Sequence, residues 1–128
     1  MVYLETSVAL AALLSEDRHP AAEFWGAEFV ASRLLEYELW VRAHALGVGA
    51  ALAEAIDTLL ARVHLVEMRT DVLERVLDPF PVRLRTLDAI HLATIDHLHR
   101  RGIVVRLASY DRRLNEAADL LGLALEPL

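Results

Sequence analysis

The sequence predicts an α/β fold, a single domain with a parallel β-sheet of four to five strands and helices on both faces. Short apolar runs alternate along the chain with segments whose apolar residues recur at helical spacing. Strands that alternate with helices in this way are typical of a parallel sheet. No repeat, low-complexity tract or linker interrupts the 128 residues, so we expect one domain over residues 1–128.

Three strands and four helices are predicted in the first half of the chain. The strands are short apolar runs at Val2–Leu4, Phe29–Ala31 and Val63–Met68. Hydroxyl side chains, which can accept a hydrogen bond from a free backbone N–H, mark two of the helix starts. The helices are Ser7–Leu14 with Thr6 or Ser7 as its cap, Pro20–Ala27, a helix from its cap Ser32 to about Leu46 that Gly47 and Gly49 end, and Val48–Arg62.

The second half of the chain contains the remaining elements. Thr86 is the predicted cap of its longest helix, which runs to about Arg101 and is followed by Gly102. The clearest strand of the chain comes next, at Ile103–Leu107. The other elements are a short helix at Asp71–Leu77, a break at Asp78–Pro81, a helix at Tyr110–Leu121 that Gly122 ends, and a final edge strand at Leu123–Leu125.

The composition excludes several classes of protein. The chain has no cysteine, so it has neither a disulfide framework nor a thiolate metal site. Although 55% of its residues are hydrophobic, its apolar runs are far shorter than the roughly 20 residues that cross a membrane. No basic segment precedes the first apolar run, as one would in a signal peptide. We therefore expect a cytoplasmic protein that has no membrane partner.

Four carboxylates lie where predicted strands end or predicted helices begin. Glu5 follows the first strand, and Glu38 lies in the helix after the second. Asp88 lies in the first turn of the helix after Thr86, and Asp111 follows the fourth strand. Parallel sheets bind ligands at the carboxyl ends of their strands, so these groups converge if the strands are neighbours. Oxygen ligands without cysteine suit Mg²⁺ or Mn²⁺, and a cation would offset the repulsion among them.

Single residues of this set also have other interpretations. Asp88 and Asp111 can each serve a helix N-terminus, where acidic residues are favoured. Glu38 is harder to explain in that way, because a carboxylate on an apolar stretch is costly unless a partner compensates it. His91, one turn after Asp88, is expected to be a hydrogen-bonded core residue rather than a metal ligand or a general base.

The segments that hold these carboxylates resemble the four motif blocks of PIN-domain ribonucleases, and most closely those of VapC-type toxins of toxin–antitoxin pairs. The blocks occur in the order of the family and span nearly the whole chain. They read "VYLETSVALAALL", "SRLLEYELW", "LRTLDAIHLATI" and "ASYDRRLNEAADLLGL". Glu5 stands where the family usually has its first Asp, and the other acidic positions are matched by Glu38, Asp88 and Asp111.

This resemblance implies a PIN-like domain that acts as a metal-dependent endoribonuclease and hydrolyses RNA phosphodiester bonds. It also implies a toxin that a cognate antitoxin protein neutralises, and a homodimer. Mg²⁺ or Mn²⁺ would be held by the catalytic carboxylates Glu5, Glu38, Asp88 and Asp111. The hydroxyl residues that could support these ligands are Thr6, Ser7 and Ser109.

Basic residues flank two of the acidic blocks. The whole chain has a formal net charge of −6, which does not favour simple affinity for nucleic acid, but Arg83 to Arg113 contains seven arginines and three aspartates. The candidates for contacts with RNA phosphates are Arg83, Arg85, Arg112 and Arg113. An equally good interpretation is that each of them is a solvated surface arginine.

Glu5 is the one clear departure from the pattern of the family. It keeps the charge of Asp but adds a methylene, a reach of roughly 1.5 Å, whereas Mg²⁺ demands near-ideal octahedral geometry. We expect metal to bind still and activity to be reduced. The alternative is a catalytically weak or inactive PIN scaffold that acts through protein or RNA binding. A receiver-like signalling module is disfavoured, because such modules use a lysine and this chain has none.

Overall fold

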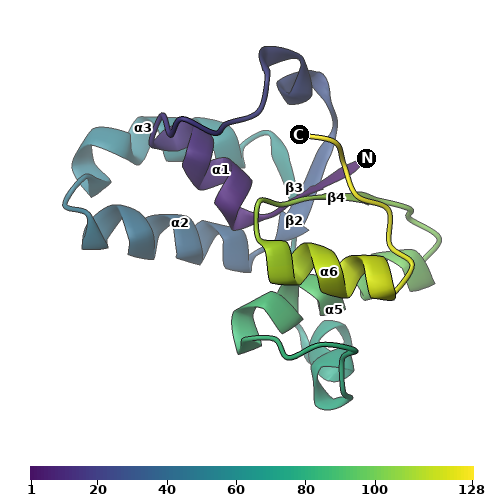
Figure 1. Cartoon of the computed structure of the whole chain (residues 1–128). Helices are drawn as coiled ribbons and strands as arrows, with labels where there is room; N and C mark the ends of the chain where they lie inside the picture. Colours follow the sequence, from purple (N-terminus) through teal and green to yellow (C-terminus); the bar gives the residue numbers. More distant parts are fainter.

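Four parallel strands form the central sheet in the structure, a computed structural model that describes all of residues 1–128 (Figure 1). The strands lie in the order β3–β2–β1–β4, and every neighbouring pair is parallel. They are β1 (Val2–Leu4), β2 (Phe29–Ser32), β3 (Val63–Val66) and β4 (Arg106–Ala108). The predicted α/β fold with a parallel sheet is therefore confirmed, with four strands.

Helices occupy the connections between the strands and the end of the chain. Two of them, η1 and η2, are short 3₁₀ helices. None is long and apolar enough to cross a membrane. They are α1 (Thr6–Leu13), η1 (Ala22–Gly26), α2 (Leu34–Ala45), α3 (Gly49–Leu60), α4 (Thr70–Leu73), η2 (Glu74–Leu77), α5 (Thr86–Arg100) and α6 (Arg112–Leu120).

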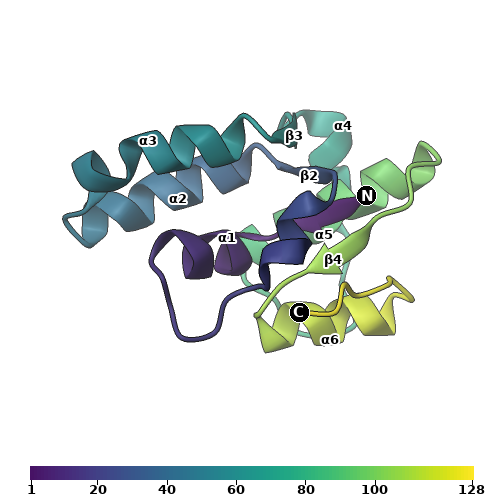
Figure 2. The same cartoon turned by 90° about the horizontal axis from the view of Figure 1, so that it is seen from above.

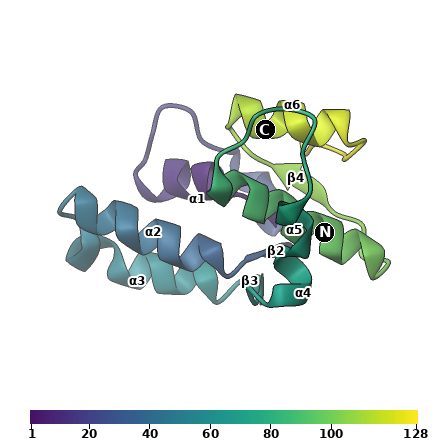
Figure 3. The ribbon, with the colours of Figure 1, turned by 90° about the horizontal axis from the view of Figure 1, so that it is seen from below.

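The two faces of the sheet are covered by different helices. Successive side chains of a strand point to opposite faces, so Val2 and Leu4 pack in one apolar cluster with α1, α2 and α3, whereas Tyr3 packs in another with α5 and α6. Figure 2 shows α2 and α3 on one side of the strands and α6 on the other, and Figure 3 shows the same separation from below. The domain is therefore a three-layer sandwich around the sheet.

The chain changes direction across the sheet at β1. It runs from β1 to β2 and β3 on one side, and then returns to add β4 on the other side of β1. Ligands of open α/β sheets bind outside the carboxyl ends of the strands at such a reversal. Glu5 and Ser109 directly follow β1 and β4, so both lie at this point.

Three helix caps differ from the prediction. Ser32 is the last residue of β2, and Arg33 is the N-cap of α2, although the Ser32 hydroxyl accepts a hydrogen bond from the Leu34 N–H at 3.1 Å. The cap of α1 is Glu5, whose carboxylate accepts a hydrogen bond from the Ser7 N–H at 3.0 Å, rather than Thr6 or Ser7. Thr86 is the first residue of α5 instead of its cap, and Arg85 before it makes no side-chain capping bond. A carboxylate can cap α1 because a helix N-terminus favours negative charge.

Several segments are shorter than predicted, and the third strand, for example, ends at Val66 rather than Met68. Pro20–Ala27 contains only the five-residue η1, in which Phe24 and Trp25 pack against Phe29 with ring centroids 5.1 and 5.6 Å from it. The fourth strand begins at Arg106 rather than Ile103. Its only strand partner is the three-residue β1, so the ladder can start no earlier than the residue opposite Val2.

The remaining differences lie at turns and ends. Gly47, with φ of 71°, does end α2, but Gly49 begins α3 instead of ending α2. The helix predicted over Asp71–Leu77 is divided into α4 and η2. The predicted edge strand Leu123–Leu125 forms only an isolated bridge between Leu107 and Leu125. A single bridge is too short to count as a fifth strand.

Truncation of a core side chain tests the assignment of the apolar cluster between the sheet and α5. Leu92 is 1% exposed in this cluster, whereas Leu77 at the end of η2 is 86% exposed. We expect Leu92→Ala to lower the free energy of unfolding by about 2–5 kcal/mol, because it leaves a cavity. Leu77→Ala, the matched control, should change it by less than about 0.5 kcal/mol in the same urea titration. Equal losses would contradict the assignment.

Candidate active site

Glu5 is held at the end of β1 by hydroxyl side chains. Only 5% of it is exposed. Its Oε2 accepts hydrogen bonds from the N–H and hydroxyl of Ser7 and, at 3.0 Å, from the hydroxyl of Ser109. Its other oxygen, Oε1, is not used by these bonds. Ser7 after β1 and Ser109 after β4 therefore both hydrogen-bond to one oxygen of Glu5 and leave its second oxygen available.

Glu38 projects from α2 between apolar residues, with 21% of its side chain exposed. Its Oε1 accepts from the Thr6 hydroxyl at 2.7 Å and from Nε2 of His91 at 2.7 Å. Burial by itself would raise the pKa of Glu38, but the hydrogen bond and charge of His91, together with Thr6, outweigh burial and lower that pKa. Glu38 is thus stabilised as an anion, and Oε2 remains available to a ligand.

Asp111 occupies the N-cap of α6. Its Oδ1 accepts from the Leu114 N–H at 3.0 Å, while its own N–H donates to the Ser109 hydroxyl at 2.9 Å. The Ser109 carbonyl accepts from the Asn115 side-chain amide at 2.9 Å. Ser109 therefore connects Asp111 to Glu5, and Oδ2 of Asp111 is left unbonded.

Asp88 lies in the first turn of α5 and accepts none of these hydrogen bonds. Burial raises its pKa above the ordinary value, and the negative charges of Asp111, Glu5 and Glu38 raise it further, against an opposing effect of His91. Charges act in this way only at short range in a protein. Asp111, Glu5 and Glu38 therefore all lie within electrostatic range of Asp88, and we refer to the four carboxylates as the acidic cluster.

The cluster fits a divalent cation in its chemistry. Each of the four carboxylates has an oxygen that no protein donor occupies, and oxygen donors are those that Mg²⁺ and Mn²⁺ prefer. The repulsion that raises the pKa of Asp88 is a property that a cation would relieve. No three acidic or histidine side chains are already arranged to hold an ion.

The four predicted RNA-binding arginines lie close in sequence to Asp88 and Asp111. They are exposed, and none of them forms an ion pair with an acidic side chain. Arg83 and Arg85 precede α5, which carries Asp88, and Arg112 and Arg113 open α6 directly after Asp111. These four guanidinium groups are thus free to contact phosphates.

Tyr3, His91 and Arg18 were not predicted from the sequence as site residues, and the first two are joined to Glu38 by hydrogen bonds. His91 is fully buried and hydrogen-bonded as expected, but its partners are Tyr3 and Glu38. The guanidinium of Arg18 lies 4.3 Å from the ring centre of Tyr110. The three-residue spacing from Asp88 places His91 on the same face of α5 as that carboxylate. Nothing in the sequence indicates the partner of Arg18.

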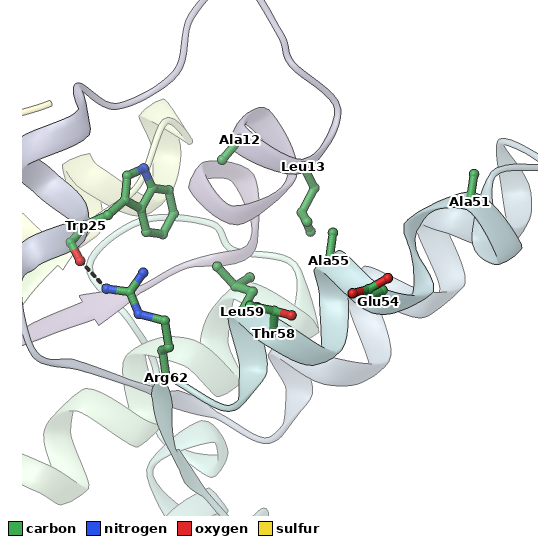
Figure 4. A pocket seen from close by; sticks show the side chains of 9 residues that line it. All are labelled: Ala12, Leu13, Trp25, Ala51, Glu54, Ala55, Thr58, Leu59 and Arg62. Carbon is green, nitrogen blue, oxygen red and sulfur yellow. Dashed lines mark hydrogen bonds between the residues drawn. The ribbon is translucent and has the colours of Figure 1, made fainter.

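Two pockets lie on the same side of the sheet as α1. One of about 530 Å³ is away from the carboxylates, between α1, α3 and η1, where the Arg62 guanidinium donates to the Trp25 carbonyl (Figure 4). The other, of about 410 Å³, reaches the cluster through Thr6 and Glu38, and Tyr37 is among its apolar walls. The second pocket is therefore the one that adjoins the candidate site, although the first is larger.

Comparisons with known proteins agree with this architecture. The sequence model of a family described as PIN domain matches residues 2–120. Ribonuclease VapC35 of Mycobacterium tuberculosis is 34% identical over 131 residues, 98% of this chain and 95% of that protein. Ribonuclease VapC46 of the same species is 47% identical over 70 residues, 51% of this chain and 50% of that protein. A chain of a toxin–antitoxin complex from Klebsiella pneumoniae has the same fold. Its TM-score is 0.66 and its identity 20%, over 100% of this chain and 98% of that chain.

The pKa shifts of Glu38 and Asp88 predict opposite effects of pH on two variants. Glu38 has a lowered pKa, so its anion stabilises the fold above the ordinary value of 4.5, and this contribution is lost as pH falls through the folded pKa. Asp88 has a raised pKa, so its anion destabilises the fold at neutral pH, and this penalty is absent below its ordinary value of 3.8.

We therefore expect the stability of Glu38→Gln relative to the parent to fall as pH rises from about 3 to 7, and that of Asp88→Asn to increase. Urea unfolding midpoints over this range measure both trends. Trends of the same sign for the two variants would contradict the assigned electrostatics.

Proposed function

This chain belongs to the PIN-domain family and, within it, to the VapC ribonucleases, and we propose that it is a divalent-metal-dependent endoribonuclease toxin. The observation that carries this proposal is the cluster of four carboxylates, each with an oxygen that the protein leaves free. The pKa of Asp88 is raised chiefly by burial, and the negative charges of Asp111, Glu5 and Glu38 raise it further, a repulsion that a cation would relieve. Such a cluster is costly to a fold that has no use for it.

In this proposal Glu5, Glu38, Asp88 and Asp111 hold Mg²⁺ or Mn²⁺, which when bound activates a water molecule and neutralises charge on the phosphoryl oxygens. The hydroxyls around Glu5 and the His91 contact to Glu38 hold two of these ligands in place. Attack by water leaves a 5′-phosphate and a 3′-hydroxyl. The reaction therefore does not need the RNA 2′-hydroxyl.

The substrate of the proposed enzyme is RNA. Phosphate contacts supply most of the affinity of proteins for nucleic acids and come mainly from arginine and lysine. This chain has no lysine, so arginines must provide them. The unpaired candidates on the two sides of the cluster are Arg83, Arg85, Arg112 and Arg113.

A cognate antitoxin protein is the proposed inhibitor, and the active form is proposed to be a homodimer in the cytoplasm. The structural neighbour from Klebsiella pneumoniae is itself a toxin–antitoxin complex. The pocket beside Thr6 and Glu38 has mostly apolar walls, and Tyr37 and Val41 on its rim are 50% and 68% exposed. Exposed apolar surface of this kind often marks a protein interface.

A second candidate function is that of a catalytically weak scaffold that acts by binding protein or RNA. Glu5 favours it, because this position usually holds Asp in the family. The Oε2 of Glu5 is already occupied by donors from Ser7 and Ser109. Cleavage that depends on metal and on the carboxylates distinguishes the enzyme from the scaffold.

Substitution of Asp88 tests the proposed enzyme. We expect Asp88→Asn to lower the rate of Mn²⁺-dependent RNA cleavage by about 100-fold or more, because it removes a charged ligand. Asp96→Asn is the matched control on the same helix, since Asp96 pairs on the surface with Arg100 at 2.6 Å. The assay follows a labelled RNA with and without EDTA and identifies the product ends.

Cleavage by the parent that EDTA does not affect, or that survives unchanged in Asp88→Asn, would count against the enzyme and favour the scaffold. The Asp96→Asn protein should retain the activity of the parent. A loss of the same size in both variants would show a general effect of charge on α5.

Shortening Glu5 tests whether its extra methylene limits activity. We expect Glu5→Asp to increase the rate of metal-dependent cleavage by about tenfold or more, because reaction rates are sensitive to displacements of about 1 Å. The shorter side chain also loses reach toward Ser109, so the melting temperature should fall. A Glu5→Asp protein that cuts no faster than the parent would show that Glu5 already serves as a competent ligand.

A further inference from the structure

A continuous chain of hydrogen bonds crosses the core next to Glu38. The Tyr3 hydroxyl lies 2.9 Å from Nδ1 of His91, and Nε2 of the same ring lies 2.7 Å from Oε1 of Glu38. Both Tyr3 and His91 have 0% of their surface exposed. The chain of contacts therefore joins β1 and α5 to the single carboxylate of the cluster that lies on α2.

Every hydrogen bond in this chain can point toward Glu38. An ionised carboxylate only accepts, so Nε2 of His91 is the donor to Glu38. In a neutral ring with its proton on Nε2, Nδ1 accepts and the Tyr3 hydroxyl donates to it. In the protonated ring, whose charge stabilises the Glu38 anion, Nδ1–H donates to the Tyr3 oxygen, and the bond from Nε2 to Glu38 is unchanged. The Ser32 N–H in turn donates to the Tyr3 oxygen at 3.1 Å. The far end of the chain is thus anchored on the backbone of β2, inside the sheet.

Core packing alone does not require this polar pair. Buried polar groups are costly unless all of them find partners, and an apolar pair of similar volume can fill the same space. What the polar pair adds is a donor to one oxygen of Glu38. The last torsion of a glutamate side chain has a broad energy well. His91 and Thr6 both donate to Oε1 and therefore restrict the rotation of the Glu38 carboxylate about this torsion. They leave Oε2 available to a ligand.

We propose that His91 and Tyr3 are positioning residues that fix the rotation of the Glu38 carboxylate, so that Oε2 is presented to the metal ion. The inference rests on the proposed function, because it takes Glu38 to be a metal ligand. Neither residue contacts substrate or metal itself. Loss of such an outer partner typically lowers metal affinity by about 10- to 100-fold.

Calorimetric titration of Mn²⁺ alone into the full chain tests the role of His91. His91→Leu removes the donor at similar volume, and we expect Mn²⁺ affinity to fall by about 10- to 100-fold. His91→Gln can place an amide N–H near the position of Nε2, and it should recover most of that affinity. A merely structural role for the imidazole predicts no such rescue.

The same substitution in a second background separates positioning from general stability. In Glu38→Gln the carboxylate through which His91 acts is absent, so adding His91→Leu should not weaken Mn²⁺ binding further. Thermal unfolding of the parent, the two single variants and the double variant records any loss of stability independently. Tyr3→Phe, which deletes only a hydroxyl, should weaken binding by about two- to tenfold. If His91→Leu does not fold, the Mn²⁺ affinity of Tyr3→Phe tests the positioning role instead.

Three results would overturn the inference in different ways. Equal Mn²⁺ affinity of the parent, His91→Leu and Tyr3→Phe rejects the positioning role and leaves the metal-dependent function standing. An equal loss on His91→Leu with and without the Glu38 carboxylate also rejects it, because His91 then acts through stability. A parent chain that binds no Mn²⁺ rejects the proposed function, and the inference with it.

Discussion

Mutual repulsion among carboxylates is the constraint on which the arrangement of this protein depends. Glu5, Glu38, Asp88 and Asp111 come from different elements, and the pKa of Asp88 is raised by its burial and, in addition, by the charges of the other three. Two of the four, Glu5 and Asp111, occupy helix N-caps, where free N–H groups and the helix dipole favour an anion. Glu38 has two side-chain donors instead. Asp88, which has neither kind of hydrogen bond, shows the remaining repulsion most clearly.

The polar groups that hold the cluster also connect the layers of the fold. Ser109 after β4 donates to Glu5 after β1, and His91 on α5 links Tyr3 in the sheet to Glu38 on α2. These contacts join both faces of the sheet to a single edge. Buried networks of this kind are stable only when every member is satisfied, and they then specify one arrangement of the core. Packing and site geometry are thus coupled, and a change in either is expected to affect the other.

Local features of the sequence predict a large part of this architecture. The alternation of apolar runs with helical segments predicts the parallel sheet, because period and residue type are local properties. Glu38 is recognisable as a candidate because a carboxylate on an apolar helix face requires a partner. The cap of α1 shows the limit of such reasoning. Thr6 is the better local cap, but its hydroxyl donates to Glu38, 32 residues away, and Glu5 caps the helix instead.

By itself, then, the sequence determined the fold class, the strand-end positions of the carboxylates and the family to which they point. Only the tertiary structure decided which groups share partners: Ser109 with Glu5, and Tyr3 with His91. These pairs are separated by 104 and 88 residues: Ser109 meets Glu5 because β4 pairs with β1, and His91 meets Tyr3 because α5 packs on that face of the sheet. Strand order also set the start of β4, since β1 offers it only three residues to pair with. Residue type and period are carried by neighbours in the chain, whereas hydrogen-bond partners are chosen by neighbours in space.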